Sequence, residues 1–162
     1  DNGRKVTKAG FVKDNRGLTY YLDEKGNKVL GLHEINGDLY YFRRGGAYKY
    51  TQLGDMWQDS INYIDGKIYY FGHDGRAIKN RFYQWGNYWY YFYADGSAAT
   101  GAVQINGQQL YFDKNHGRQV KGAFAPDGHY YDENSGELVT NQTRTIKGVT
   151  YHFDENGNAT KV

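Results

Sequence analysis

An aromatic triplet recurs along the chain, and this repetition constrains the fold more than any other feature of the sequence. Its form is Tyr-Tyr-Phe or a close variant, and the copies begin at positions 20, 40, 69, 90, 110, 129 and 151. Successive copies lie 20, 29, 21, 20, 19 and 22 residues apart. A period near 20 residues is typical of repeat proteins, in which each unit must stack on its neighbours to bury its apolar face.

Glycines keep the same period on both sides of each triplet. One set precedes the triplets, at 17, 37, 66, 86, 107, 128 and 148, and a second set follows them, at 26, 46, 75, 96, 117, 136 and 157. Asn-Gly and Asp-Gly, which are frequent in the first set, favour two-residue hairpin turns. Because about 20 residues leave no room for a crossover helix, successive strands should be antiparallel. We therefore predict an all-β fold, a β-solenoid of seven tandem stacked β-hairpins.

The repeat boundaries follow from the same spacing. We expect residues 1–162 to form a single array cut from a longer protein that extends N-terminally, because Gly3–Val6 resembles the end of a repeat at Gly117–Val120. The one long step is interpreted as a lengthened hairpin loop near Arg43–Ser60, which includes Trp57. The expected units are a truncated tail at 1–9 and hairpins at 10–31, 32–60, 61–80, 81–101, 102–122, 123–141 and 142–162.

Composition excludes several classes of partner. Tyr, Phe and Trp supply 29 residues and take over much of the core from aliphatic side chains, while 20 basic and 18 acidic residues leave a net charge of +2. Without a basic run there is no electrostatic footprint for a nucleic acid. Apolar stretches stay well short of the 18 residues that span a bilayer, so membrane insertion is not expected. The absence of Cys excludes disulfides and thiolate metal sites.

Catalytic, metal and cofactor sites are not predicted. The acidic residues fall mostly in the polar turns, where Asp and Asn accept backbone hydrogen bonds. The five His residues occupy unlike repeat positions and lack the spacing of a metal motif. We therefore expect this chain not to be an enzyme by itself and to need no cofactor or metal.

A family resemblance is carried by residues 89–122. This stretch combines two aromatic triplets with Gln104-Ile-Asn-Gly107 and Gln119-Val-Lys-Gly122 in a fixed order, and it resembles the glucan-binding repeats at the ends of glucansucrases such as dextransucrase. Arg81-Phe-Tyr and the segment from Ser135 to Asn141 are also similar to that family. More weakly, the whole chain resembles the cell-wall-binding repeat superfamily, which includes choline-binding modules.

The resemblance implies a non-catalytic module that binds an α-glucan such as dextran and tethers it near an attached catalytic domain. Residue chemistry supports sugar recognition independently, because an exposed Tyr offers a flat apolar face and amide and ammonium groups reach sugar hydroxyls. In the family, a Tyr of one hairpin combines with Gln and Lys of the next. The predicted sugar-binding residues are Tyr90 or Tyr91, Gln104, Tyr111, Gln119 and Lys121, with Trp85, Trp89 and Trp57 as the next candidates.

Two other functions stay open from the sequence. One is a cell-surface module that binds choline or a host oligosaccharide, and the other is a structural spacer. Choline cages commonly use a Trp after the glycine between repeats, whereas Phe11, Leu32 and Ala102 stand at those positions here. We expect a secreted or cell-surface bacterial protein, and a monomer.

Overall fold

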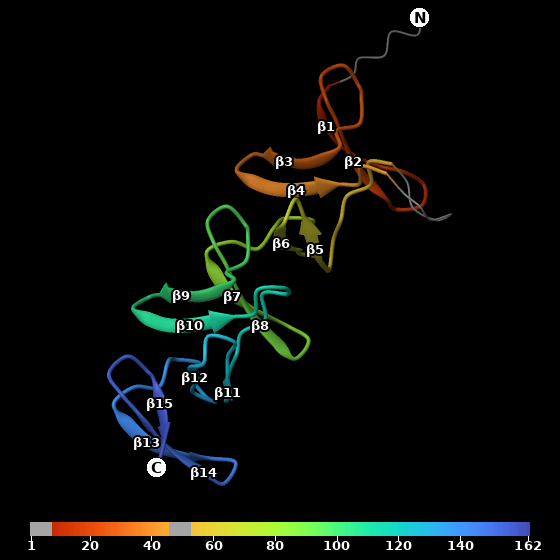
Figure 1. The fold of residues 1–162 in the computed structure, drawn as a ribbon. Coiled ribbons are helices and arrows are strands. Elements are labelled where there is room, and N and C mark those ends of the chain that lie inside the picture. Colours follow the sequence, from red (N-terminus) through yellow and green to blue (C-terminus); the bar gives the residue numbers. More distant parts are fainter. Residues whose placement is uncertain (1–7, 46–52) are drawn as a thin grey trace, which may run out of the picture. The chain divides into compact units, whose positions relative to one another are not determined.

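The computed structural model describes residues 8–45 and 53–162, and every element in them is a β-strand (Figure 1). The chain divides into two compact units, Asp1–Lys79 and Asn80–Val162, each of which is considered by itself. No helix that could cross a membrane occurs in the described part of the chain. The prediction of an all-β fold built from tandem hairpins of about 20 residues is confirmed.

Each unit is a series of antiparallel hairpins whose strands are neighbours in sequence. The described residues of the first unit contain β1 (Gly10–Lys13) with β2 (Thr19–Leu22), β3 (Gly31–Ile35) with β4 (Asp38–Phe42), and β5 (Ser60–Ile64) with β6 (Lys67–Phe71). The second contains β7 (Arg81–Trp85) with β8 (Tyr88–Phe92), β9 (Gly101–Ile105) with β10 (Gln108–Phe112), β11 (Ala123–Phe124) with β12 (Tyr130–Tyr131), and β13 (Gln142–Ile146) with β14 (Val149–Phe153) and β15 (Ala159–Lys161).

Two-residue turns with Asn-Gly or Asp-Gly close the β3–β4, β5–β6 and β9–β10 hairpins. Asn36 and Gly37 both have positive φ, at 52° and 84°, as do Asn106 and Gly107 at 52° and 81°. This is the geometry of a type I′ turn, whose twist matches that of the flanking strands. The turn dipeptides therefore favour this hairpin register through local backbone geometry.

Backbone bonds join each hairpin to the chain that leaves it. After the last triplet position the chain turns back and forms an isolated bridge to that position, as Ala77 does with Phe71 and Gln119 does with Phe112. The same returning residue donates its N–H to the preceding hairpin, at the residue just before the triplet. These donor and acceptor pairs are Met56 and Thr19, Ala77 and Leu39, Gln119 and Trp89, and Leu138 and Gln109. Each returning segment thus links two consecutive hairpins within a unit.

The aromatic triplets form the cores, and they are buried on both faces of the hairpins. The third position is fully buried at Phe42, Phe71, Phe92, Phe112 and Phe153. The middle position is buried as well in most repeats, as Tyr41, Tyr70 and Tyr111 show, so these hairpins do not leave an aromatic face free. The returning segment and the next hairpin cover that face, as Val120, Ala125 and Tyr131 do for Tyr111.

The additional residues of the second repeat lie after β4. Phe42 bridges to Met56, fourteen positions on, whereas Phe71 bridges to Ala77, six positions on. The hairpin turn itself, at Asn36 and Gly37, keeps the usual two residues. The extra length therefore belongs to the returning connection and not to the hairpin loop, although residues 46–52 of the predicted 43–60 loop lie outside the described residues.

Candidate functional site

The six residues predicted to bind sugar have very different exposures. Tyr90 and Tyr111 are buried, with 1% and 2% of their surface exposed, and their rings belong to the core. Tyr91 is half-buried and packs edge-on against Phe82, with ring centroids 4.8 Å apart. Gln119 is also half-buried, whereas Gln104 and Lys121 are exposed. The structure therefore leaves the amides, the ammonium group and part of one Tyr as surfaces that a ligand could reach.

Strand register separates Gln104 from the other polar groups. Gln104 pairs with Gln109 and Ala102 pairs with Tyr111, so these four side chains share one face of the β9–β10 hairpin. Gln108 and Leu110 point to the opposite face. The predicted set is thus divided between two faces, with Gln104 and Tyr111 on one of them.

A pocket in the second unit brings Gln119 and Lys121 together with Trp89. Its cavity volume is about 210 Å³, and Gln108, Leu110, Phe82 and Ser135 complete the lining. Trp89 of β8 is 37% exposed, and the Lys121 Nζ lies 5.6 Å from the centroid of its ring. A flat ring, two amides and one ammonium group therefore face a single small cavity.

Backbone geometry assembles this pocket. The Gln119 N–H donates to the Trp89 carbonyl oxygen at 2.9 Å, so the returning segment runs beside the strand that carries the ring. Lys121, two residues further on, also donates from Nζ to the Asn134 carbonyl oxygen at 3.5 Å. The pocket thus draws on three consecutive hairpins of the second unit.

Gly136 leaves room for the Gln119 side chain. Its φ is 74°, and a Cβ built there would overlap the Gln119 Nε2 and would come within 3.3 Å of the Lys121 Cγ. Any other residue would therefore be strained in its backbone and would displace the Gln119 side chain. Glycine at this position supports both the turn and the open pocket.

Trp89, Phe82 and Gln108 were outside the predicted set, although Trp89 was among the next candidates. Strand alternation could have grouped these side chains, because Trp89 pairs with Gln84 and lies on the same hairpin face as Phe82 and Tyr91. The sequence did not say which face of the β7–β8 hairpin would stay partly open.

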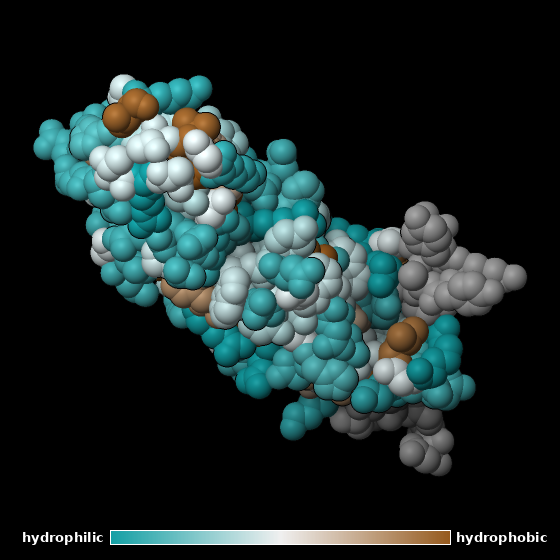
Figure 2. Space-filling model, turned by 90° about the horizontal axis from the view of Figure 1, so that it is seen from below, coloured by the Kyte–Doolittle hydropathy of each residue, from teal (hydrophilic) through white to brown (hydrophobic). Residues whose placement is uncertain are grey.

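The surface of the molecule suits a polar ligand. Figure 2 shows one face that is mostly hydrophilic or intermediate in hydropathy, with small separate hydrophobic areas. Exposed large side chains include several aromatic rings, among them Trp85, Tyr88, Trp89 and Tyr93. Such rings offer flat faces for stacking without creating a large apolar patch.

The aspartates serve the turns. The Asp113 carboxylate accepts backbone N–H bonds from Asn115, His116 and Arg118 at 2.7–3.0 Å. Burial opposes these bonds, but together they lower the pKa of Asp113. Asp132 accepts N–H bonds from Ser135 and Asn134, and its pKa is lowered by these bonds and by Arg144. These carboxylates are ionised structural acceptors in the turns.

A metal centre is not found in residues 8–45 and 53–162, where the His, Asp and Glu side chains form no group of three that could hold an ion. Several Lys and Arg side chains lie over aromatic rings of the chain. Lys28 lies 3.9 Å from the centroid of the Tyr20 ring, and Arg118 lies 4.1 Å from that of Tyr88.

Repeat family models match most of this architecture. Residues 99–142 match a choline-binding repeat, and residues 9–28, 80–98 and 144–159 match a putative cell wall binding repeat. The chain belongs to the proteins built from these cell-wall-binding repeats. Repeat domains of this kind bind carbohydrate or cell-wall polymers, and they point to an extracellular or cell-surface bacterial protein.

Within that class, the chain is similar to streptococcal glucosyltransferases. It is 38% identical to Glucosyltransferase-I of Streptococcus downei over 98% of this chain, and 39% identical to Glucosyltransferase-S of Streptococcus mutans serotype c over 92% of this chain. The chain spans about a tenth of the length of these relatives. The match covers a non-catalytic repeat region of these enzymes.

Solved structures of related repeats share the fold. Choline-binding protein F from Streptococcus pneumoniae is 28% identical, with a TM-score of 0.75 over 94% of this chain and 48% of that one. The modular autolysin LytC from the same organism, at 20% identity, has a TM-score of 0.71 over 95% of this chain and 34% of that one. The prediction of a glucansucrase-type repeat region with this hairpin fold is confirmed.

Proposed function

We propose that this chain is a non-catalytic module that binds α-glucan through the pocket of Trp89, Gln119 and Lys121. The observation that carries the proposal is the approach of the Lys121 Nζ to the Trp89 ring beside the Gln119 side chain. A pyranose presents C–H groups on its faces and hydroxyls around its edge. The Trp ring can stack on such a face while the amide and the ammonium group bond to the hydroxyls.

The chemistry of the pocket favours a neutral polyhydroxylated ligand. Lys121 carries the charge of the lining, it is exposed, and its Nζ already contacts a backbone carbonyl. Recognition of an anion would call for a group of bidentate donors such as Arg. Gln108, Gln119 and Ser135 instead supply neutral donors and acceptors that match hydroxyl groups.

The relatives support an α-glucan as the ligand. Their name, glucosyltransferase, describes enzymes that transfer glucose units, and a repeat region beside such a catalytic domain would keep glucan chains close to it. Several weak sites on one polymer raise the effective concentration of each contact. In this proposal the chain belongs to a secreted glucansucrase and acts by tethering.

Choline is the second candidate, because a choline-binding repeat matches residues 99–142. A quaternary ammonium binds over aromatic faces within about 6 Å of the ring centroid. In this pocket the Lys121 ammonium already lies within that distance, 5.6 Å from the centroid of the Trp89 ring. A second cation there would be repelled by the first, so this pocket favours sugar over choline.

Affinity electrophoresis through dextran tests the proposal. The purified chain should be retarded as dextran concentration rises, and a double variant with Gln119→Ala and Lys121→Ala should be retarded less. Unchanged mobility of the parent chain at high dextran concentration would contradict the proposal. Release of the chain from a choline-type resin by free choline would favour the second candidate, and binding to neither polymer would favour a structural spacer.

Gln104→Ala is the matched control. Gln104 is an exposed amide on the face of the β9–β10 hairpin opposite Gln108 and Leu110. Its removal should leave dextran retention near that of the parent chain. Strong loss in this variant with normal retention in the double variant would move the site to the face of Gln104 and Tyr111.

A further inference from the structure

The first unit contains two adjoining pockets around Met56 and Gln58. Their cavity volumes are about 350 and 560 Å³, and both are lined by Gly17, Thr19, Met56 and Gln58. Because both are lined by these four residues, the two pockets adjoin, and they are together called the groove. Each volume lies within the range of about 300–1,000 Å³ found for small-molecule sites.

Half of this groove repeats the geometry of the pocket in the second unit. The Met56 N–H donates to the Thr19 carbonyl oxygen at 2.7 Å, as the Gln119 N–H donates to that of Trp89 at 2.9 Å. Met56 also bridges Phe42 as Gln119 bridges Phe112. The other equivalent lining residues, with the first unit named first, are Phe11 and Phe82, Tyr40 and Leu110, and Gln58 and Lys121.

Side-chain chemistry differs between the two sites at these matched positions. Thr19 stands where the second unit has Trp89, and Gln58 stands where it has Lys121. The aromatic surface moves to Phe11, which is 43% exposed and packs against Tyr40 with ring centroids 5.1 Å apart. This half of the groove therefore keeps an exposed ring and an amide.

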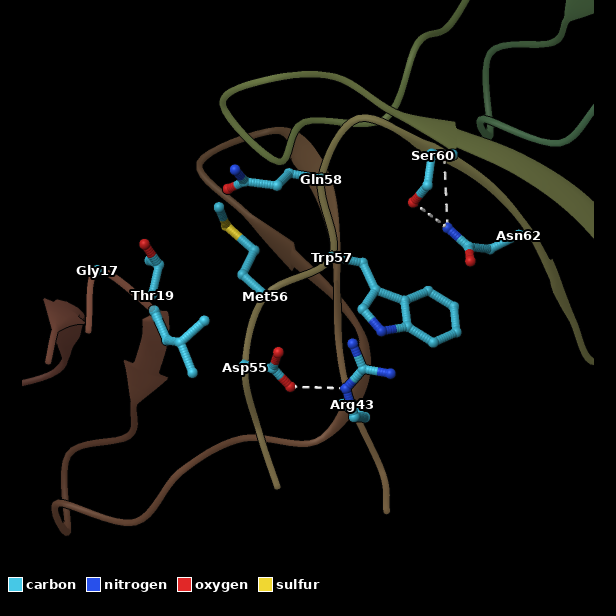
Figure 3. A pocket seen from close by; sticks show the side chains of 10 residues that line it. Gly17, Thr19, Arg43, Asp55, Met56, Trp57, Gln58, Ser60 and Asn62 are labelled. Carbon is cyan, nitrogen blue, oxygen red and sulfur yellow. Dashed lines mark hydrogen bonds and ion pairs between the residues drawn. The ribbon is translucent and has the colours of Figure 1, made fainter. Parts of the chain in front are cut away.

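Trp57 lines the other half of the groove (Figure 3). The Trp57 N–H donates to the carbonyl oxygen of the middle triplet residue, Tyr41, at 2.9 Å. The residues that make the same bond in other repeats are aliphatic, namely Val29, Ile78, Ala99, Val120 and Val139. Trp57 is thus the aromatic residue at a position that is aliphatic in these other repeats.

An ion pair from the connection that follows β4 holds the ring. The Arg43 Nε donates to the Asp55 Oδ1 at 2.8 Å, and Asp55 is buried. The Arg43 guanidinium carbon lies 5.4 Å from the centroid of the Trp57 ring. The ring also packs against the core cluster that contains Tyr41, with 4.1 Å between the two ring centroids. Figure 3 shows Arg43 between Asp55 and Trp57. The two opposite charges offset each other, which suits this end of the groove to a neutral ligand.

Hydroxyl and amide groups face the same space. Asn62 Nδ2 donates to Ser60 Oγ at 2.8 Å, and both side chains line the groove with Gln58 and Thr19 (Figure 3). Such groups can donate to and accept from the hydroxyls of several sugar rings in turn. The groove thus combines two rings, Phe11 and Trp57, with hydroxyl and amide groups. Lys13, His73 and Asp74 also line the half that contains Phe11, and there a cation and an anion offset each other.

From this arrangement we infer that the first unit carries a second carbohydrate site, a groove that takes at least two consecutive sugar units of a neutral glucan chain. This inference rests on the proposed function, because it assumes the same class of ligand. The groove differs from the pocket of the second unit in the length of the glucan chain that it binds. The small pocket of the second unit holds one sugar unit, whereas the groove gains contacts as the chain grows from Phe11 toward Trp57.

Isothermal titration calorimetry of the whole chain tests the inference, since it gives the number of sites and their affinities. Two probes are used, a glucose disaccharide and a longer linear oligosaccharide, both with the linkage of dextran. The unit-1 variant carries Gln58→Ala and Asn62→Ala, and the unit-2 variant carries Gln119→Ala and Lys121→Ala. The parent chain should bind the longer probe at two sites. The unit-2 variant should keep one site, which binds the longer probe about tenfold more tightly than the disaccharide. The unit-1 variant should keep the other site and lose this dependence on length.

Each alternative outcome separates the two proposals. A single site that is lost in the unit-2 variant and kept in the unit-1 variant overturns the groove and leaves the proposed function standing. A single site that is kept in the unit-2 variant and lost in the unit-1 variant contradicts the Trp89 pocket and supports the groove. Equal affinity for the two probes in the unit-2 variant also contradicts the inference, and absence of binding to the parent chain contradicts both. Gln109→Ala, an exposed amide in the second unit, is the matched control and should change neither site.

Discussion

The amide N–H of Gln119 donates to the carbonyl oxygen of Trp89 at 2.9 Å, which joins the end of one repeat to the second strand of the hairpin before it. This backbone bond brings polar side chains that follow one triplet beside an aromatic side chain that precedes another. Met56 and Thr19 are joined in the same way in the first unit. The candidate sites therefore arise from the link between repeats, and the side chains at the linked positions decide what each site can bind.

In a chain that also carries Gln58→Ala and Asn62→Ala, so that the groove does not contribute, Trp89→Ala should weaken dextran binding by about tenfold. This corresponds to about 1.4 kcal/mol, because the change removes the stacking face of the pocket. Trp85→Ala is the matched control, since Trp85 lies on the opposite face of the same hairpin and is similarly exposed, at 41% against 37%. It should keep most of the affinity. Affinity electrophoresis compares the two variants, and equal losses would contradict the assignment of the pocket.

Tyr111→Ala should destabilise the fold by about 3–5 kcal/mol, the range for removing a large buried aromatic side chain. Tyr111 is 2% exposed and packs against Tyr131, with ring centroids 5.7 Å apart. Gln104→Ala, on the same hairpin face but exposed, should change stability by less than about 0.5 kcal/mol. Chemical denaturation measures both, and a small effect at Tyr111 would show that its ring is not part of the core.

Gly136→Ala should lower both stability and dextran binding, because a Cβ would strain the backbone and displace Gln119. Gly128→Ala isolates the backbone part of this effect. Gly128 also has positive φ, at 85°, but a Cβ there meets no described atom within 4 Å. Both variants should lose about 1–2 kcal/mol from the left-handed conformation. Only Gly136→Ala should also bind dextran less well once folded, and normal binding by that variant would argue against Gln119 as a contact.

Stability should fall as the pH is lowered through the ordinary pKa of aspartate, about 3.9. Asp132 accepts backbone bonds from Ser135 and Asn134 and a side-chain bond from Arg144, and these lower its pKa in the folded state. The stabilisation is fully present above the unfolded pKa and is lost as the pH falls toward the lower folded one.

Thermal unfolding as a function of pH checks this linkage. Asp132→Asn should be less stable than the parent chain near neutral pH, and the difference should shrink in acid because the parent loses the ionised acceptor. Asp14 should behave similarly, since hydrogen bonds from Arg16, Leu18 and Tyr20 outweigh desolvation and lower its pKa to about 2. A parallel pH dependence in parent and Asp132→Asn would rule out the carboxylate as the source of the effect.

The sequence by itself determined the repeat and its hairpins. Asn106-Gly107 adopts positive φ at both residues for local steric reasons, and the triplet from Leu110 to Phe112 alternates faces because a strand has a period of two. Both properties depend on neighbours in the chain. For the same reason the aspartates could be assigned to the turns, where Asp113 bonds to residues two to five positions ahead.

Only the tertiary structure decided which side chains meet and which are covered. The sequence did not say whether Tyr90 or Tyr91 would be exposed. In the structure Tyr90 is buried and Tyr91 is half-buried, because different segments pack on the two faces of the hairpin. Gln104 and Gln119 are both amides of one repeat, but strand register puts Gln104 on the face of Tyr111 and a bond to the preceding hairpin puts Gln119 beside Trp89. Contacts between residues about 30 positions apart depend on how repeats stack, and local sequence patterns do not encode that distance.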